Sequence, residues 1–116
     1  MARTSSITIF RGEDISIAFT VYTTDTGSTA ENISGWTLSF SVAEARNSTS
    51  KLITKAGSIV SGAAGTFTVT IDDTDTDSIA PGSYFWDVWR TDSGSERLLG
   101  KGTFTIEGNA RIPPSA

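Results

Sequence analysis

The sequence predicts an all-β protein, namely an immunoglobulin-like antiparallel β-sandwich of about seven strands. Apolar residues alternate with polar ones along most of the chain, as in strands with one buried face. Turn signals recur at the spacing of about 8 to 12 residues that is typical of sandwiches, and no stretch fits a helix of ordinary length. Ser and Thr exceed a quarter of the residues, which suits strands whose outer face meets water.

Each expected strand rests on its own alternation. The clearest begins at Ile15, where every second residue is apolar as far as Val21. Lysines at both ends of the segment from Lys51 to Lys55 indicate an edge strand, because charge discourages pairing with another chain. The last two strands are joined by a hairpin at residues 92–95. The expected strands are residues 6–10, 15–22, 36–42, 51–55, a short piece around Ile59, 67–71, 83–91 and 98–107.

The chain is the size of one domain, since 116 residues are too few for two well-packed cores. We expect a single sandwich over residues 1–110. Residues 111–116 are expected to form a C-terminal tail, because Pro113 and Pro114 cannot continue a central strand.

Composition argues against several functions. The net charge of −4 disfavours nucleic-acid binding, which needs a basic surface. The chain has no Cys and no His, so it lacks thiolate nucleophiles, the commonest general base and the commonest transition-metal ligands. The acidic residues Glu44, Asp87, Glu96 and Glu107 are scattered and are interpreted as surface groups. We therefore expect no enzymatic activity, no cofactor and no metal site.

Two further segments bear on location and on metal binding. No apolar run is long enough for a membrane span, and residues 1–6 lack the pattern of a signal peptide, so we expect the chain to stay in the cytoplasm where it is made. The acidic run from Asp72 to Asp77 starts like a calcium loop, but Ser78 and Tyr84 stand where such a loop needs Gly and Glu. We interpret it as a crossover whose carboxylates cap backbone amides, with cation binding as the alternative.

The aromatic residues give the sharpest functional hypothesis. Trp36 shares the parity of Leu38 and is expected in the core. Tyr84 follows Pro81-Gly82 and resembles the tyrosine that fixes a sandwich corner. If Tyr84, Trp86 and Val88 point inward, then Phe85 and Trp89 point outward. Exposed aromatics are typical of interfaces, so Phe85 and Trp89 are the predicted partner-binding residues. The alternative is that a loop covers them or that a bulge reverses the parity.

Several segments together resemble small immunoglobulin-like structural proteins of tailed bacteriophages, including the N-terminal domain of the baseplate upper protein. The resemblance covers nearly the whole chain, although its motifs are mostly turn and core signals. It is carried by residues 11–14 (Arg-Gly-Glu-Asp), 33–38 (Ile-Ser-Gly-Trp-Thr-Leu), 65–69 (Gly-Thr-Phe-Thr-Val), 79–84 (Ile-Ala-Pro-Gly-Ser-Tyr), 87–90 (Asp-Val-Trp-Arg) and 98–106 (Leu-Leu-Gly-Lys-Gly-Thr-Phe-Thr-Ile).

The resemblance implies a virion structural protein, assembled in the host cytoplasm, that docks on other virion proteins. The given chain lacks the long C-terminal extension of the baseplate protein, which favours a capsid decoration (cement) protein bound to the major capsid protein. The alternatives are a tail or baseplate component bound to a tail scaffold, or a carbohydrate-binding module for host adhesion. Such components are often homo-oligomers, trimers among them.

Overall fold

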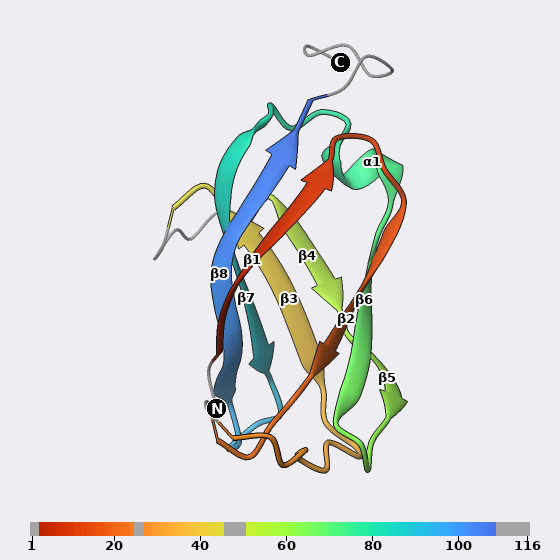
Figure 1. Cartoon of the computed structure of the whole chain (residues 1–116), viewed down its shortest axis with the longest axis vertical. Coiled ribbons are helices and arrows are strands. Elements are labelled where there is room, and N and C mark those ends of the chain that lie inside the picture. Colours follow the sequence, from red (N-terminus) through yellow and green to blue (C-terminus); the bar gives the residue numbers. More distant parts are fainter. Residues whose placement is uncertain (1–2, 25–26, 46–50, 109–116) are drawn as a thin grey trace.

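The computed structural model describes residues 3–24, 27–45 and 51–108. These ranges contain eight strands and one four-residue helix, and every expected strand is present (Figure 1). The elements are β1 (Arg3–Phe10), β2 (Ile15–Thr20), β3 (Leu38–Ala43), β4 (Ile53–Ala56), β5 (Ser58–Ser61), β6 (Thr66–Ile71), α1 (Asp73–Thr76), β7 (Gly82–Arg90) and β8 (Arg97–Glu107).

The strands form two sheets, with the orders β1-β8-β7-β3-β4 and β2-β6-β5. All pairs are antiparallel except β1 with β8, which run parallel from Arg3 opposite Gly100 to Phe10 opposite Glu107. The first, eighth, seventh, third and fourth strands therefore share one sheet, and the second, sixth and fifth share the other. This is the arrangement of an immunoglobulin-type sandwich, and the predicted fold class is confirmed.

The core lies between the inner faces of the two sheets. Phe40 of β3 and Phe67 of β6 are fully buried, and Phe19 of β2 stacks on Phe67 with ring centroids 5.0 Å apart. Trp86 of β7 stacks on Phe40 at 5.9 Å. The buried members of this cluster are Ile9, Val21, Ile33, Leu38, Phe40, Val42, Ile53, Phe67, Val69, Ile71, Trp86, Val88, Leu99, Phe104 and Ile106.

The acidic run behaves as a capped turn. The backbone N–H of Asp72 donates to the carboxylate of Asp75 at 2.7 Å, as the Asx-rich interpretation predicted. Asp14 accepts from the N–H of Asp73 at 2.7 Å, which ties α1 to the turn before β2. The Lys55 ammonium bridges the two carboxylates at 2.9 Å from Asp75 and 3.5 Å from Asp72. Its hydrogen bond with Asp75 raises the pKa of Lys55.

The corner after α1 is fixed by Tyr84, whose hydroxyl donates to the carbonyl oxygen of Ala80. This is the predicted tyrosine corner, and it sets which face of β7 turns inward.

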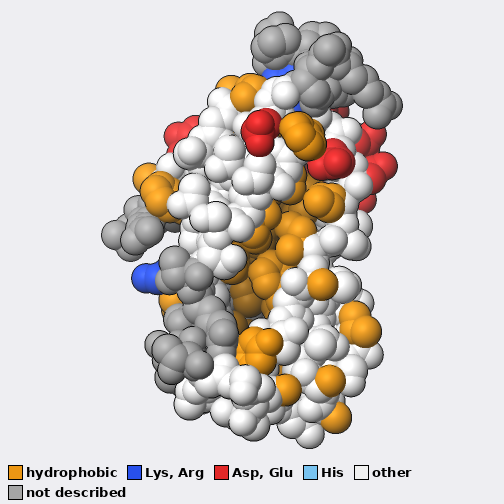
Figure 2. All heavy atoms as spheres, in the orientation of Figure 1, with side chains coloured by type: hydrophobic (Ala, Val, Ile, Leu, Met, Phe, Trp, Pro, Cys, Tyr) orange, Lys and Arg blue, Asp and Glu red, His pale blue; other side chains and the backbone are white. Residues whose placement is uncertain are grey.

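The two sheets do not close completely on the side where β1 and β2 are the edge strands. A groove of about 230 Å³ lies between these strands and reaches the core. Figure 2 shows apolar side chains lining a hollow over this part of the fold. On β2 the inward residues Ile15, Ile17 and Phe19 are only half-buried, because no strand covers them from the side.

Trp36 differs from its expected position. It lies before β3 instead of within it, and it is half-buried against the edge of the core. The turn at Ser34 and Gly35, where Gly35 has a φ of 79°, delays the start of the strand. The tail at residues 111–116 lies outside the described residues.

Candidate protein-binding surface

The long strand β7 divides its aromatic residues between the two faces of its sheet. Trp86 and Val88 are buried, and Tyr84 is half-buried against the core. Phe85 and Trp89 lie on the opposite, outer face, where Phe85 is half-buried and Trp89 is 40% exposed. The structure thus places both predicted residues on one face, four positions apart on one strand, which separates them by about 13 Å along the strand.

Neighbouring strands surround these aromatics with small side chains on the β3 side. Ser39 pairs with Trp89, Ser41 with Asp87, and Ala43 with Phe85. On the other side, Asp87 lies opposite Lys101 and Phe85 opposite Thr103. A shallow hollow of about 240 Å³ follows this face. Six of its lining residues, which we call the outer aromatic surface, are Ala43, Phe85, Asp87, Trp89, Leu98 and Lys101.

Leu98 belongs to this surface because of a β-bulge. The alternation of β8 puts Gly100, Gly102 and Phe104 on the inner face, so strict alternation would place Leu98 inside as well. The register shifts between Val88 opposite Gly100 and Trp89 opposite Leu98. The extra residue, Leu99, takes the buried position, and Leu98 turns outward beside Trp89.

The contributions of Leu98, Ala43 and Lys101 to this surface could not be predicted from the sequence. The alternation within one strand does not reveal which strands lie beside it. Pairing of β7 with both β3 and β8 brings these residues to the aromatics. The only sequence signal for the bulge is the Leu98-Leu99 pair before Gly100, which breaks the period of two.

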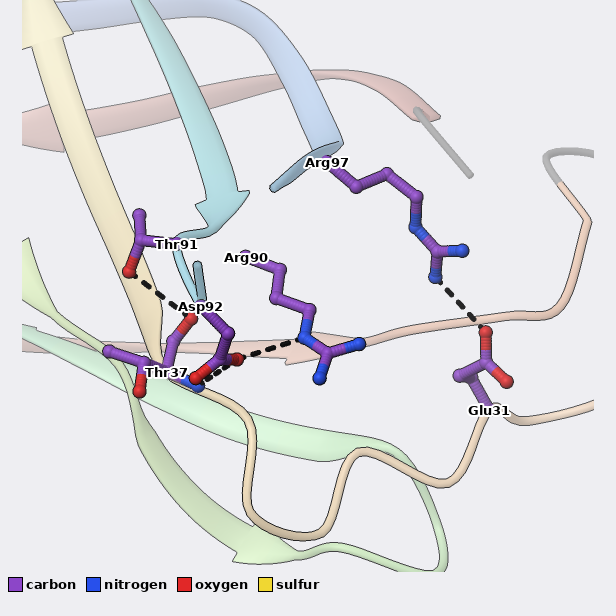
Figure 3. Close-up of polar contacts among 6 residues, drawn as sticks. All are labelled: Glu31, Thr37, Arg90, Thr91, Asp92 and Arg97. Atoms are coloured by element: carbon purple, nitrogen blue, oxygen red, sulfur yellow. Dashed lines mark hydrogen bonds and ion pairs between the residues drawn. The ribbon is translucent and has the colours of Figure 1, made fainter. Parts of the chain in front are cut away.

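A second polar cluster lies at the end of the sandwich that carries the hairpin 92–95. Asp92 accepts hydrogen bonds from the Arg90 side chain and from the N–H of Thr37, both at 2.9 Å (Figure 3). These bonds, with that to Arg90 the stronger cause, lower the pKa of Asp92 to about 2. Arg97 pairs with Glu31 at 3.1 Å.

Trp36 completes this cluster. The guanidinium carbon of Arg90 lies 4.3 Å from the centre of its ring system and that of Arg97 lies 5.3 Å away, within the range of cation–π contact. These cations are engaged by carboxylates and by the indole, so the cluster holds the hairpin against the segment before β3.

Within the described ranges, no group of three or more His, Cys, Asp or Glu side chains is placed to hold a metal ion. Of the scattered acidic residues, Glu44, Glu96 and Glu107 are exposed, whereas Asp87 is half-buried on the outer aromatic surface. The part of the chain that the structure describes also has no helix long and apolar enough to cross a membrane.

No protein-family model and no curated protein match the chain. Among solved structures, it is similar to the N-terminal domain of ORF48 from phage TP901-1, with 12% identity, a TM-score of 0.48 and coverage of 94% of this chain and 99% of that one. It is also similar to the NK cell receptor NKp44, with 14% identity, a TM-score of 0.44 and the same two coverages. At this level of similarity neither structure bears on what this chain binds.

Proposed function

We propose that this chain is a non-enzymatic structural protein of a tailed-phage particle, which docks on another virion protein through the outer aromatic surface. The observation that carries the docking role is the exposure of Trp89 on the same face as Phe85 and Leu98. The phage context rests on the sequence motifs at residues 33–38, 79–84 and 98–106, which resemble those of phage immunoglobulin-like proteins.

The energetics favour a partner on this face. Trp89 is 40% exposed, and a Trp buries up to roughly 250 Å² when fully covered. Covering the remaining ~100 Å² contributes about 2.5 kcal/mol at ~25 cal/mol per Å². On the β3 side only the small residues Ser39, Ser41 and Ala43 lie opposite this stretch of β7, so a flat or concave partner can reach the exposed part of Trp89. Aromatic residues in such positions dominate binding energy at many interfaces.

The proposed location is the capsid surface, where the chain acts as a decoration protein bound to the major capsid protein. A compact sandwich with one apolar docking face suits repeated binding to a lattice of identical subunits. The alternative location is the tail or baseplate. Binding of the purified chain to undecorated capsids and to isolated tails, compared by co-sedimentation, distinguishes the two.

Replacing Trp89 tests the docking role. We expect Trp89→Ala to weaken particle binding roughly 60-fold, the equivalent of about 2.5 kcal/mol, with Phe85→Ala showing a smaller loss. The matched control is Val60→Ala, which removes a 68% exposed apolar side chain from the other sheet and should leave binding unchanged. Thermal unfolding of each variant monitors the fold.

Wild-type affinity of a folded Trp89 variant would overturn this role, because it would show that the outer aromatic surface is not the docking face. Unfolding of the Trp89 variant would show instead that Trp89 supports the core. In that case Leu98→Ser, which alters the same face from a neighbouring strand, separates docking from folding.

Carbohydrate binding is the second candidate, and one observation favours it. Asp87 and Lys101 lie in the hollow beside Trp89, so hydrogen-bonding groups adjoin an aromatic ring on which a sugar face can stack. This function predicts that host-envelope glycans bind the isolated chain and that Asp87→Ala abolishes their binding. Protein docking predicts no glycan binding by the isolated chain.

A further inference from the structure

Strand β2 has a free edge. Over Ile15 to Thr20 it pairs residue by residue with β6, from Ile15 opposite Ile71 to Thr20 opposite Thr66. It is the first strand in the order β2-β6-β5, so the described chain places no strand on its other side. Strand β1 pairs with β8 over its whole length, instead of covering β2. The outer backbone groups of β2 therefore have no strand partner.

This edge lacks the protection usual for exposed strands. The segment Ile-Ser-Ile-Ala-Phe-Thr of β2 has no charge and no proline, and its pairing with β6 runs without a bulge. The edges on the opposite side of the sandwich are protected. There β4 carries Lys55, and β5 is only four residues long with a register shift beside Ile59. Free, flat and uncharged edges tend to pair with another strand.

The groove beside β2 is equally uncharged. Its lining comes from β1, β2, β6, β7 and β8 and includes the half-buried Ile17 and Phe19, with no Asp, Glu, Lys or Arg. Figure 2 shows the hollow as a continuous apolar area. A partner at this edge thus gains both backbone hydrogen bonds and apolar contact.

We propose that the occupant is a second copy of this chain, paired antiparallel through β2 about a twofold axis. In such a pair, directly opposed residues point to the same side of the sheet. The outward residues of one β2 strand therefore meet the outward residues of the other, and the inward residues likewise meet each other. Residues with even numbers, Ser16, Ala18 and Thr20, are small and face outward, so Ala18 meets Ala18 or Ser16 of the second copy. Ile17 and Phe19 meet their counterparts on the inner side. The two grooves then join, and no charges are opposed along the strands.

Charge at the two ends of the sandwich favours the antiparallel direction. β2 starts at the end that carries Glu13, Asp14 and the acidic run 72–77, seen as the red area at the top of Figure 2. It runs to the end where Arg90 pairs with Asp92 and Arg97 pairs with Glu31, so the arginine charges there are already neutralised. Antiparallel pairing keeps the acidic ends of the two copies apart and places each beside this paired end of the other copy. A parallel arrangement would bring two acidic ends together.

The test is the oligomeric state of the full chain, measured by light scattering at several concentrations. We expect the wild type to have twice the mass of the chain, whereas Ala18→Lys, which makes two ammonium groups direct or diagonal neighbours across the axis, stays monomeric. The matched control is Val60→Lys, on the β5 edge of the same sheet, which should remain dimeric. A monomeric wild type, or a dimer or trimer that persists in the Ala18 variant, would overturn the proposal.

A second measurement fixes the face. The chain has no cysteine, so Ala18→Cys and Val60→Cys each provide one site for a nitroxide label. The two position-18 residues lie about 4.5–5.5 Å apart if directly opposed and about 7–8 Å apart if diagonal, so labels at position 18 should show strong dipolar broadening in either register and labels at position 60 none. A dimer without broadening at position 18 would place the contact elsewhere and overturn the β2 assignment.

This inference is independent of the docking function, because β2 and the outer aromatic surface belong to different sheets. The Trp89→Ala variant should still dimerise. The Ala18→Lys variant should still bind particles, with an affinity reduced only by the loss of bivalency. Failure of one property without the other therefore identifies which assignment is wrong.

Discussion

At the scale of single residues, one end of the sandwich is held by side chains that each contact two other residues. Asp92 accepts from both Arg90 and Thr37 and so joins the hairpin to the segment before β3. Arg90 in turn covers Trp36 at 4.3 Å. Removing one group at this end therefore weakens a chain of contacts.

Asp92 gives a prediction on pH. Its pKa is lowered from 3.8 to about 2 in the folded protein. The carboxylate therefore contributes stability above pH 4, and that contribution is lost as the pH falls from about 4 towards 2. We expect Asp92→Asn to be less stable than the wild type at pH 6, and the difference to shrink over this range. Thermal unfolding of both proteins between pH 6 and pH 2 measures it. A constant difference would contradict the assignment.

The sequence predicted side-chain orientation well where the orientation of one residue in the strand could be inferred independently. The tyrosine corner at Tyr84 set the phase of β7, and alternation then placed Phe85 and Trp89 outside. No such independent inference was available for Leu98 or Trp36. A bulge altered the phase of Leu98, and a glycine turn removed Trp36 from its strand. The phase of alternation holds only as far as the next irregularity of the backbone.

At the scale of elements, the attachment of β1 to the rest of its sheet depends on Gly102. A Cβ at this position would lie 1.6 Å from the carbonyl oxygen of Ser5 and 2.9 Å from the indole nitrogen of Trp86. That indole N–H donates to the same Ser5 oxygen at 3.1 Å. Only glycine lets β1, β8 and the Trp86 ring approach this closely.

We expect Gly102→Ala to destabilise the fold by about 3 kcal/mol or more, because backbone cannot yield as a flexible side chain does. The control is Gly82→Ala in β7, where the nearest atoms to a new Cβ are 3.9 Å away. Urea unfolding gives the loss of stability, and hydrogen exchange at β1 amides should rise first. Equal stability of the two variants would show that β1 can shift without cost.

Strand positions could be predicted from the sequence, but strand neighbours could not. Alternation revealed each strand because it records one buried face. The parallel pairing of β1 with β8, and the free edge of β2 that results, arise from contacts between residues about 100 positions apart. No pattern within either strand encodes that choice.

At the scale of the whole molecule, one aromatic cluster joins the two sheets. Phe40 of the five-stranded sheet lies 6.0 Å from Phe19 of the three-stranded sheet and 6.1 Å from Phe104 of β8. Both sheets therefore share the same buried contacts, and neither has a separate core. We infer that the sandwich unfolds as a single cooperative unit.

Phe40→Ala tests this inference. The substitution should lower the free energy of unfolding by about 3 to 5 kcal/mol, and urea should still unfold both sheets in one transition. Tryptophan fluorescence reports on the five-stranded sheet, through Trp86 and Trp89 of β7 and through Trp36 just before β3, and the exchange of β6 amides reports on the other sheet. Two separate transitions would show that the sheets are stable independently.

The parallel register of β1 and β8 also determines how the molecule bears load. The described chain enters the sandwich at Arg3, at one end, and leaves it after Glu107, at the other (Figure 1). Tension along this axis pulls the two terminal strands in opposite directions along their length. Their eight paired positions then resist together in shear, instead of separating one after another as in a hairpin pulled open from its end. A load applied between the two ends of the described chain therefore meets this shear resistance without any additional bond.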